Sequence, residues 1–408
     1  MRIAEPGTLA AVRRGRVGGG AALLGIAALL AVGSASARPG AARAGTSGSP
    51  LAGPAAAALL SAPPRQEARR YELTGPAVRI SDLAGHVSVV AGDGDRVVVL
   101  VRRQGRDAGR LRVEADERAG TLTVRVPGDR LVYPELGLHS RVTLRVGEDG
   151  LFGDGRRMTV AGSGSGPEAR ADLTVQVPRG LRAAIEVGAG PVEARGVPAE
   201  LDLRTGSGRV HADGTGGALR VRTGSGNVEA AATAGRLEVH TGSGDVEVRD
   251  ASAAVELRTG SGDIRVRGRV GGSFRAHTGS GSVTAGDIKG EAVDVRTGSG
   301  GIRIAAVAAD DVTLHTGSGS VRADLARAPS GLSVDTGSGS VELALPRDAS
   351  ADLDIRTGSG GIRTEAPLQL LWNERSHVRG RLGSGGPDYV IRTGSGSVSL
   401  KAADSGGG

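Results

Sequence analysis

Two shortages mark this sequence of 408 residues: cysteine is absent, and aromatic side chains are few. Without cysteine the chain cannot form disulfides, a thiolate metal site or a cysteine nucleophile. It contains three Tyr, two Phe and one Trp, so we expect a thin core of small aliphatic side chains rather than one built on large rings.

The excess of positive charge is confined to the first 70 residues. The formal net charge is +7, and residues 1–70 contain nine Arg against two Glu. Residues 71–408 therefore carry no net charge. Binding of nucleic acid is not expected, because it relies on a surplus of Lys and Arg over the binding surface.

Glycine is abundant, with 70 copies, and many of them belong to the motif Thr-Gly-Ser-Gly. Successive motifs are separated by 18 to 21 residues, until a last gap of 36. The motifs begin at Thr205, Thr223, Thr241, Thr259, Thr278, Thr297, Thr316, Thr336, Thr357 and Thr393. A fixed period of this length is typical of solenoids and other repeat arrays.

The flanks of each motif predict two short strands. Apolar and polar residues alternate before it, as in Leu219-Arg220-Val221-Arg222, and after it, as in Val228-Glu229-Ala230. Such alternation indicates strands with one buried face, and it places the Thr of each motif on the buried side. We predict an all-β fold, a β-solenoid of about a dozen coils with 18–21 residues each and Thr-Gly-Ser-Gly at the corners. The alternative is a row of antiparallel hairpins that turn at Gly-Ser-Gly.

The first 37 residues have the pattern of a signal peptide. Three Arg between positions 13 and 16 precede an apolar run over 21–32, and Ala35-Ser36-Ala37 follows. We expect cleavage after Ala37 and export to the periplasm, the cell surface or the extracellular medium. An uncleaved membrane anchor is the alternative, and in both cases contact with the membrane is limited to this segment.

The rest of the chain divides by composition and repeat quality. Residues 38–70 and 402–408 are expected to be a disordered linker and a disordered tail. Between them we expect an irregular N-terminal β cap region at 71–180, solenoid repeats at 181–364 and a C-terminal capping coil at 365–401. The cap region includes a Gly- and Ser-rich stretch, 151–166, expected to be a loop.

Several segments together resemble a known family. They are Tyr71 to Gly75, Ile80 to Val89, Val175 to Gly180, the Thr-Gly-Ser-Gly units and Leu382 to Leu400. Over about 71–400 the chain resembles the bacterial β-strand-repeat proteins of unknown function that are classed as adhesins. The resemblance implies a β-solenoid at the cell envelope and no established enzyme activity, and it supplies no catalytic motif.

One outward column of residues is mostly cationic. Its basic members are Arg204, Arg222, His240, Arg258, His277, Arg296, His315 and Arg356. The plain interpretation is a solvated face with charge pairing between strands. The functional interpretation is a strip that meets an anionic envelope glycan or another surface protein. The His residues are expected two coils apart, about 9.6 Å, which is too far for zinc.

The motifs point to no catalytic, cofactor or metal site. We therefore favour an exported, non-enzymatic adhesion or structural module of the bacterial envelope. A polysaccharide-active enzyme on a β-helix is one alternative. The other is an envelope-stress sensory module with an uncleaved N-terminal anchor.

Overall fold

The computed structural model describes residues 68–402, and these form an all-β fold. The predicted signal segment, most of the linker and the tail at 403–408 lie outside the described residues. Within the described part, no helix is long and apolar enough to cross a membrane.

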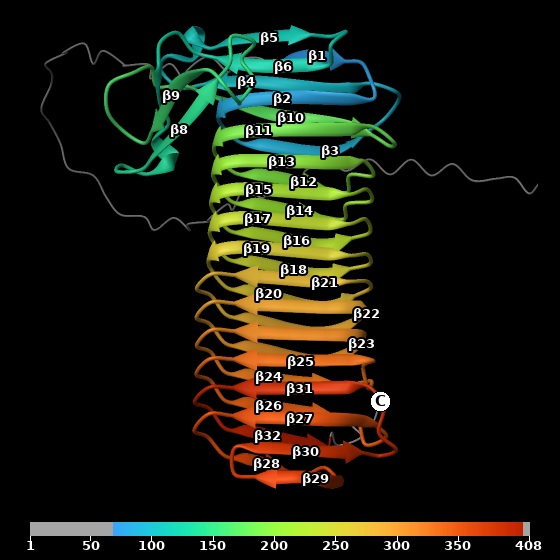
Figure 1. Cartoon of the computed structure of the whole chain (residues 1–408). Helices are drawn as coiled ribbons and strands as arrows, with labels where there is room; N and C mark the ends of the chain where they lie inside the picture. Colours follow the sequence, from blue (N-terminus) through green and yellow to red (C-terminus); the bar gives the residue numbers. More distant parts are fainter. Residues whose placement is uncertain (1–67, 403–408) are drawn as a thin grey trace, which may run out of the picture. The chain divides into compact units, whose positions relative to one another are not determined.

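The repeats form a β-solenoid, as predicted. Each motif is the corner between two strands, and equivalent strands of successive coils lie side by side in parallel, for example β13 with β15 and β15 with β17 (Figure 1). The strands are β11 (Arg182–Ala189), β12 (Val192–Arg195), β13 (Glu200–Ser207), β14 (Val210–Asp213), β15 (Leu219–Ser225), β16 (Val228–Thr233), β17 (Leu237–Ser243), β18 (Val246–Ala251), β19 (Val255–Ser261), β20 (Ile264–Val270), β21 (Phe274–Thr278), β22 (Val283–Thr297), β23 (Ile302–Thr316), β24 (Val321–Leu325), β25 (Gly331–Thr336) and β26 (Val341–Leu345). Parallel pairing in register excludes the hairpin alternative.

The core is a set of aliphatic columns inside the coils. Leu257 stacks between Val239 and Ala276, and all three are fully buried. On the opposite wall Val228 and Val246 pair in the same way. The Thr of every motif is also buried, which confirms its inward orientation.

Close stacking of the corners explains why the motif needs glycine. A Cβ built on Gly224 would lie 2.6 Å from the carbonyl oxygen of Gly206, one coil away. A Cβ on Gly226 would lie 2.1 Å from the oxygen of Gly208. Any side chain at these positions would push neighbouring coils apart, so both glycines of the motif are required by the approach of one backbone to the next.

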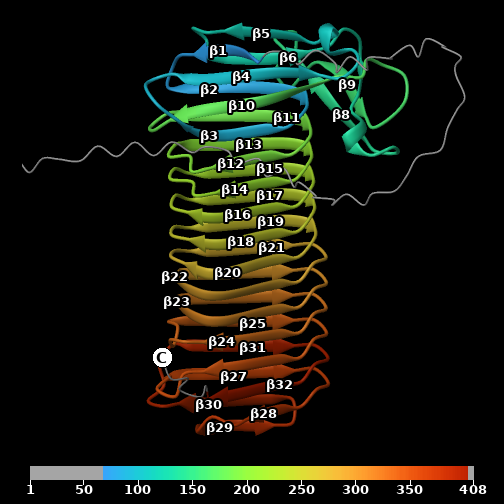
Figure 2. The ribbon, with the colours of Figure 1, turned by 180° about the vertical axis from the view of Figure 1, so that it is seen from behind.

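The ladder continues into the N-terminal region. Strands β2 and β3 pair in parallel with β11 and β12 and so form one further, irregular coil. Antiparallel strands then lie at that end of the stack (Figure 2). The main-sheet strands are β1 (Arg69–Leu73), β2 (Ala77–Ala84), β3 (Val87–Gly92), β4 (Val97–Gln104), β5 (Arg112–Asp116), β6 (Thr121–Arg125) and β10 (Arg170–Pro178). Two 3₁₀ turns, η1 (Ala108–Arg110) and η2 (Pro134–Leu136), connect strands here.

A separate three-stranded sheet stands beside the first coils. It consists of β7 (Arg130–Val132), β8 (Arg141–Val146) and β9 (Arg156–Ala161). The expectation of a loop over 151–166 was wrong in its middle, because β9 pairs with both β7 and β8. Met158 and Val160 alternate with more exposed neighbours and are buried, a period-two signal that the surrounding Gly and Ser obscured.

The end of the chain departs from its sequence order. β31 (Asp388–Thr393) lies between β25 and β27 (Ala351–Thr357), and β32 (Val398–Ala402) lies between β26 and β28 (Ile362–Thr364). Figure 1 shows β31 in red among the orange strands.

Only part of the segment expected to cap the stack does so. β29 (Leu368–Glu374) and β30 (His377–Leu382) form an antiparallel pair beyond β27, at the end of the stack, whereas 388–402 is an inner coil. Trp372 on β29 is about half exposed, at 52%.

Candidate binding face

The structure brings the predicted cationic column onto one face of the stack. Seven of its eight basic residues, from Arg204 to His315, face outward on strands that neighbour one another in turn, and Asp335 follows them. Arg392 also belongs to this column, because it lies between Asp335 and Arg356. The sequence analysis did not place Arg392 in the column, because its coil lies between two coils that precede it in the sequence, although its Thr-Gly-Ser-Gly motif matches the others.

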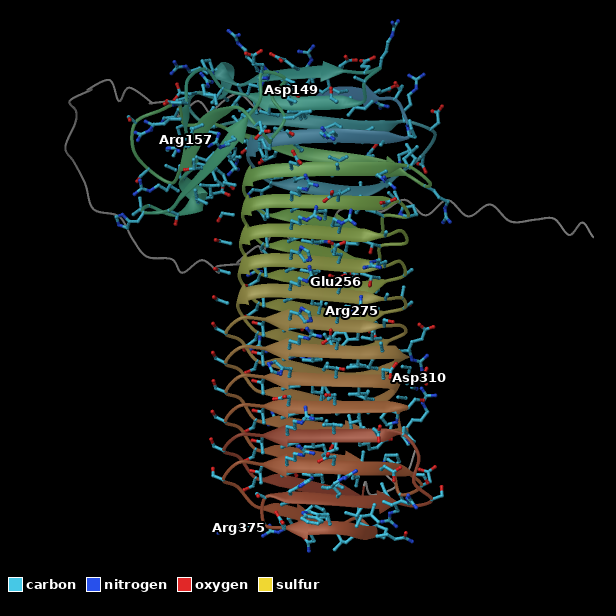
Figure 3. The ribbon with its side chains drawn as sticks, viewed as in Figure 1. Asp149, Arg157, Glu256, Arg275, Asp310 and Arg375 are labelled. Atoms are coloured by element: carbon cyan, nitrogen blue, oxygen red, sulfur yellow. The ribbon has the colours of Figure 1, made fainter. Side chains whose placement is uncertain are left out.

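Every one of the eight basic residues lies near a carboxylate. The shortest nitrogen–oxygen distances are Arg204 to Glu186 at 2.8 Å, Arg222 to Glu238 at 3.5 Å, His240 to Glu238 at 3.7 Å, Arg258 to Glu256 at 2.7 Å, His277 to Asp294 at 3.6 Å, Arg296 to Asp294 at 2.8 Å, His315 to Asp335 at 4.0 Å and Arg356 to Asp354 at 2.9 Å. Most of the carboxylates come from the neighbouring column of the same strands, where Figure 3 labels Glu256 and Arg275. The face is thus a ladder of opposite charges rather than a row of free cations.

Partial burial shifts the pKa values of two neighbouring residues of this ladder, Glu238 and His240. Burial alone would raise the pKa of Glu238, but the hydrogen bond from Arg220 and the nearby positive charges lower it overall. Burial is also the main cause that lowers the pKa of His240. The imidazole of His240 is therefore favoured in its neutral form at pH 7.

A groove opens where the three-stranded sheet meets the first corners. Val142 and Leu144 of β8 lie so close to Gly206 and Gly188 that a Cβ there would approach them within 2.7 and 2.4 Å. Next to this contact is a groove of about 610 Å³, whose side-chain lining comes mainly from Phe152, Glu186, Arg204, Arg222 and His240.

The charges in this groove are not equally engaged. Arg204 is held by two close carboxylates, at 2.8 and 2.9 Å, whereas Arg222 lies 3.5 and 3.9 Å from its two. Arg222 is therefore the cation of the groove that is most readily available to a bound anion.

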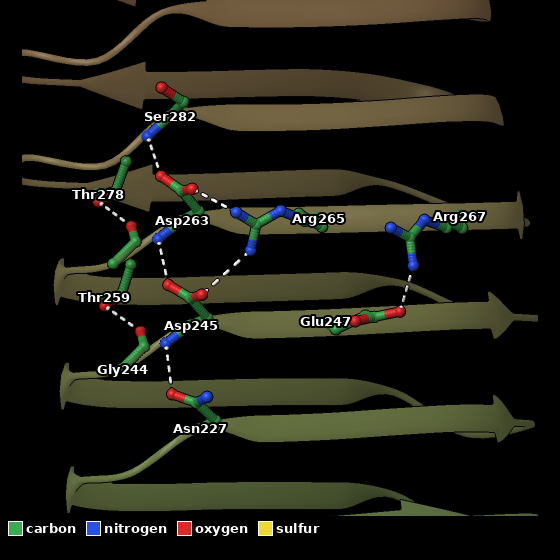
Figure 4. A network of polar contacts seen from close by, with 11 residues as sticks. Asn227, Gly244, Asp245, Glu247, Thr259, Asp263, Arg265, Arg267, Thr278 and Ser282 are labelled. Atoms are coloured by element: carbon green, nitrogen blue, oxygen red, sulfur yellow. Dashed lines mark hydrogen bonds and ion pairs between the residues drawn. The ribbon is translucent and has the colours of Figure 1, made fainter.

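A second ladder, at the corner positions directly before β16, β18 and β20, was missed by the sequence analysis. The side chains of Asn227, Asp245 and Asp263 each accept a hydrogen bond from the backbone N–H of the equivalent residue in the next coil (Figure 4). Arg265 bridges the two Asp side chains. The backbone N–H of Asp263 is the main cause that lowers the pKa of Asp245. With these partners the ladder stabilises the stack and holds no open ligand position.

Asp82 occupies an unusual place in the irregular coil. It pairs with Val187, which pairs with Thr205, so it stands where later coils have Thr. Its side chain is fully buried, and the groups that favour its charged form are the backbone N–H groups of Ala84 and Leu83. Burial raises the pKa of Asp82 well above its ordinary value, so the group is favoured in its neutral form.

The residues described, 68–402, contain no group of three or more His, Cys, Asp or Glu side chains that could hold a metal ion. His240, His277 and His315 are separated along the ladder by Arg258 and Arg296, as their spacing predicted.

Comparison with known proteins agrees with this architecture over the regular coils. Residues 232–401 match the family model of Toastrack DUF4097. The match is to a repeat family of unknown function. It excludes the three-stranded sheet, and of the residues that line the groove it includes only His240, Thr241 and Gly242.

Comparison with individual proteins adds little. A crystal structure of a “putative cell adhesion protein” from Clostridium sporogenes aligns with 83% of this chain and 100% of its own, at 9% identity and a TM-score of 0.18. A TM-score this low does not show a shared fold. No curated protein matches the sequence.

Proposed function

We propose that this protein is exported and acts as a non-enzymatic adhesion or structural module of the bacterial envelope, binding an anionic polymer along its cationic column. The observation that carries the proposal is the column itself, in which Arg or His recurs in register from Arg204 to Arg356. Parallel coils repeat about every 4.8 Å, so an extended polyanion can meet successive coils in turn.

The ion pairs determine how such binding would behave. Because each basic side chain already has a carboxylate nearby, an incoming anion must compete with it, and each coil contributes little. Affinity then arises from many weak contacts between one polymer chain and successive coils. Each contact that forms raises the effective concentration of the polymer at the neighbouring coils. Attraction of this kind is local and is screened beyond about 10 Å at 0.1 M salt.

Retention of the full-length protein on immobilised teichoic acid or acidic polysaccharide, eluted by a salt gradient, tests the proposal. Arg222→Gln alone should hardly change elution. Arg222, Arg258 and Arg296 replaced together should elute at clearly lower salt.

The matched control removes three Arg from the other wall of the solenoid, namely Arg249, Arg267 and Arg322, which are about as exposed. If both triple variants elute together, net charge and not the column governs retention. If the parent is never retained, the column is only a solvated face.

Export is tested separately, by N-terminal sequencing of the protein from the envelope fraction. The mature chain should begin at Arg38, directly after the Ala35-Ser36-Ala37 site. An intact Met1 on membrane-bound protein would instead favour an uncleaved anchor.

A further inference from the structure

The last repeat fills a seat between two coils that precede it in the sequence. Its strand β31 pairs in parallel with β25 on one side and with β27 on the other. Its strand β32 does the same with β26 and β28. We call the segment 388–402 the inserted coil. All of its ladder contacts are therefore with parts of the chain that could form before it arrives.

The motif contacts of this seat recur in most other coils. Thr393 donates a hydrogen bond from its Oγ1 to the carbonyl of Gly339, at 2.8 Å. Thr357 donates in the same way to Gly396 of the inserted coil, at 2.8 Å. The coil at 351–364 carries the same motif, so without the inserted coil Thr357 could take the place of Thr393. The spacing of 21 residues from Thr336 to Thr357 is the longest between regular motifs. This extra length lets the chain cross the position of the inserted coil before it forms the coil at 351–364.

One side chain makes the seat selective for the inserted coil. Tyr389 stacks between Leu332 and Leu353, is fully buried, and donates its hydroxyl to the carbonyl oxygen of Pro329, at 2.8 Å. If the coil at 351–364 took the position of the inserted coil, Leu353 would replace Tyr389 and could not donate this hydrogen bond. The seat therefore prefers segment 388–402 to its neighbour, but it does not distinguish which copy of the chain supplies that segment.

The connection to the inserted coil has the composition of a hinge. β30 and β31 lie on opposite sides of β27, and residues 383–387, Gly-Ser-Gly-Gly-Pro, cross from one to the other. Gly383, Gly385 and Gly386 all have positive φ, which glycine adopts without strain. A short Gly- and Ser-rich segment of this kind can take other paths at little cost.

We propose that the inserted coil exchanges between two copies of this protein, each copy filling the seat of the other. The exchanged dimer keeps every contact of the seat, including the bond from Tyr389, and differs only in the path of the hinge. Each copy gives and receives the same segment, so the interface closes on two chains. This inference concerns self-association and stands independently of the proposed polymer binding.

Cysteine cross-linking of the full-length chain tests the exchange without background, because the natural sequence has no cysteine. Ser333 and Val390 are neighbours across the seat, on the outer face. Parallel neighbours lie about 4.8 Å apart, within the range that a disulfide can span. One copy carries Ser333→Cys, another carries Val390→Cys, and the two are unfolded, mixed, refolded and oxidised.

The matched control mixes copies carrying Thr313→Cys with copies carrying Ser333→Cys. These positions are neighbours in the same column but both lie outside the inserted coil. A third variant carries Ser333→Cys and Val390→Cys in one chain and reports whether the seat forms as described.

Exchange predicts a disulfide-linked species of twice the chain mass from the first mixture and none from the control. Deleting Gly385 and Gly386 should increase its yield, because a shorter hinge hinders return to the chain's own seat. The proposal is overturned if the double variant closes its disulfide within one chain, while the mixture of Ser333→Cys and Val390→Cys copies yields no linked dimer with either the full or the shortened hinge. Equal linked dimer in the control would also overturn it, by showing contact between faces instead of exchange.

Discussion

Two Thr residues with the same sequence motif should respond differently to replacement by Val. At Thr297 the hydroxyl is part of a relay: Oγ1 donates to the carbonyl of Gly281 at 2.7 Å and accepts from the N–H of Gly300 at 3.1 Å. Val would leave both backbone groups buried without a partner. Each such loss costs about 1–3 kcal/mol, so we expect Thr297→Val to destabilise its coil by about 2–6 kcal/mol.

At Thr223 the same relay is not formed. The N–H of Gly226 donates to Ser243 of the next coil instead of to the Thr hydroxyl, and Oγ1 of Thr223 is buried without a partner within the described residues. Replacing this hydroxyl by a methyl group removes no hydrogen bond. Thr223→Val should therefore change stability by less than about 0.5 kcal/mol, or raise it.

Denaturant unfolding of the two variants, together with native-state hydrogen exchange of their corner amide groups, measures the difference. Exchange is needed because a stack of repeats can open locally without unfolding as a whole. Protection should fall at the amide of Gly300 in Thr297→Val and stay unchanged at Gly226 in Thr223→Val. Equal losses in the two variants would refute the assignment of the relay to one part of the stack.

Three further predictions concern the core, the corners and the buried acid. Leu257→Asp should lower the melting temperature sharply, because it buries an unpaired charge at a cost of several kcal/mol, whereas Arg258→Asp on the outer face should cost about 1 kcal/mol or less. Gly360→Ala should cost more than about 2 kcal/mol, because its Cβ would lie 2.0 Å from a carbonyl oxygen, while Gly361→Ala, with nothing within 4 Å, should be neutral or gain up to about 1 kcal/mol in the same denaturant titration. Burial raises the folded-state pKa of Asp82, so its contribution to stability is complete below its unfolded pKa and is lost as pH rises through the folded value; Asp82→Asn should raise the melting temperature more at about pH 7 than at about pH 4, and an equal shift at both would contradict this.

The regular coils could be predicted from sequence because their signals are local. Alternation of period two identifies the buried face, and the recurring motif gives the register, so that both together are enough to place Leu257 between Val239 and Ala276. Both signals repeat in every coil and reinforce one another. The inward Thr followed from the same alternation.

Features that depend on distant contacts could not be predicted in this way. The period-two signal of segment 156–161 is hidden among Gly and Ser residues, and the segment becomes a strand through its pairing with β7 and β8. Likewise, the relay forms at Thr297 and not at Thr223 because the backbone of the two corners differs. The two motifs are identical in sequence, so the sequence cannot predict this difference.

The position of the last coil could not be predicted for a different reason. Coils 351–364 and 388–402 carry the same motif, so the ladder itself accepts either order. The choice depends on single contacts, such as the bond from Tyr389 to Pro329, and on the antiparallel pair β29–β30 that lies beyond β27. Sequence repeats define the kind of contact a coil makes but not which coil makes it.

The same degeneracy limits what the binding face can recognise. A polymer that shifts by one coil along the cationic column meets nearly the same pattern of charges, so the regular coils can hold it without fixing its position. Only an irregular place can supply a register. In this column the groove beside Phe152 is such a place, because there a loosely held cation, Arg222, lines the groove together with an aromatic side chain from the segment between β8 and β9. Strength of retention should thus depend on the length of the column, and any preference for one end of a polymer on this groove.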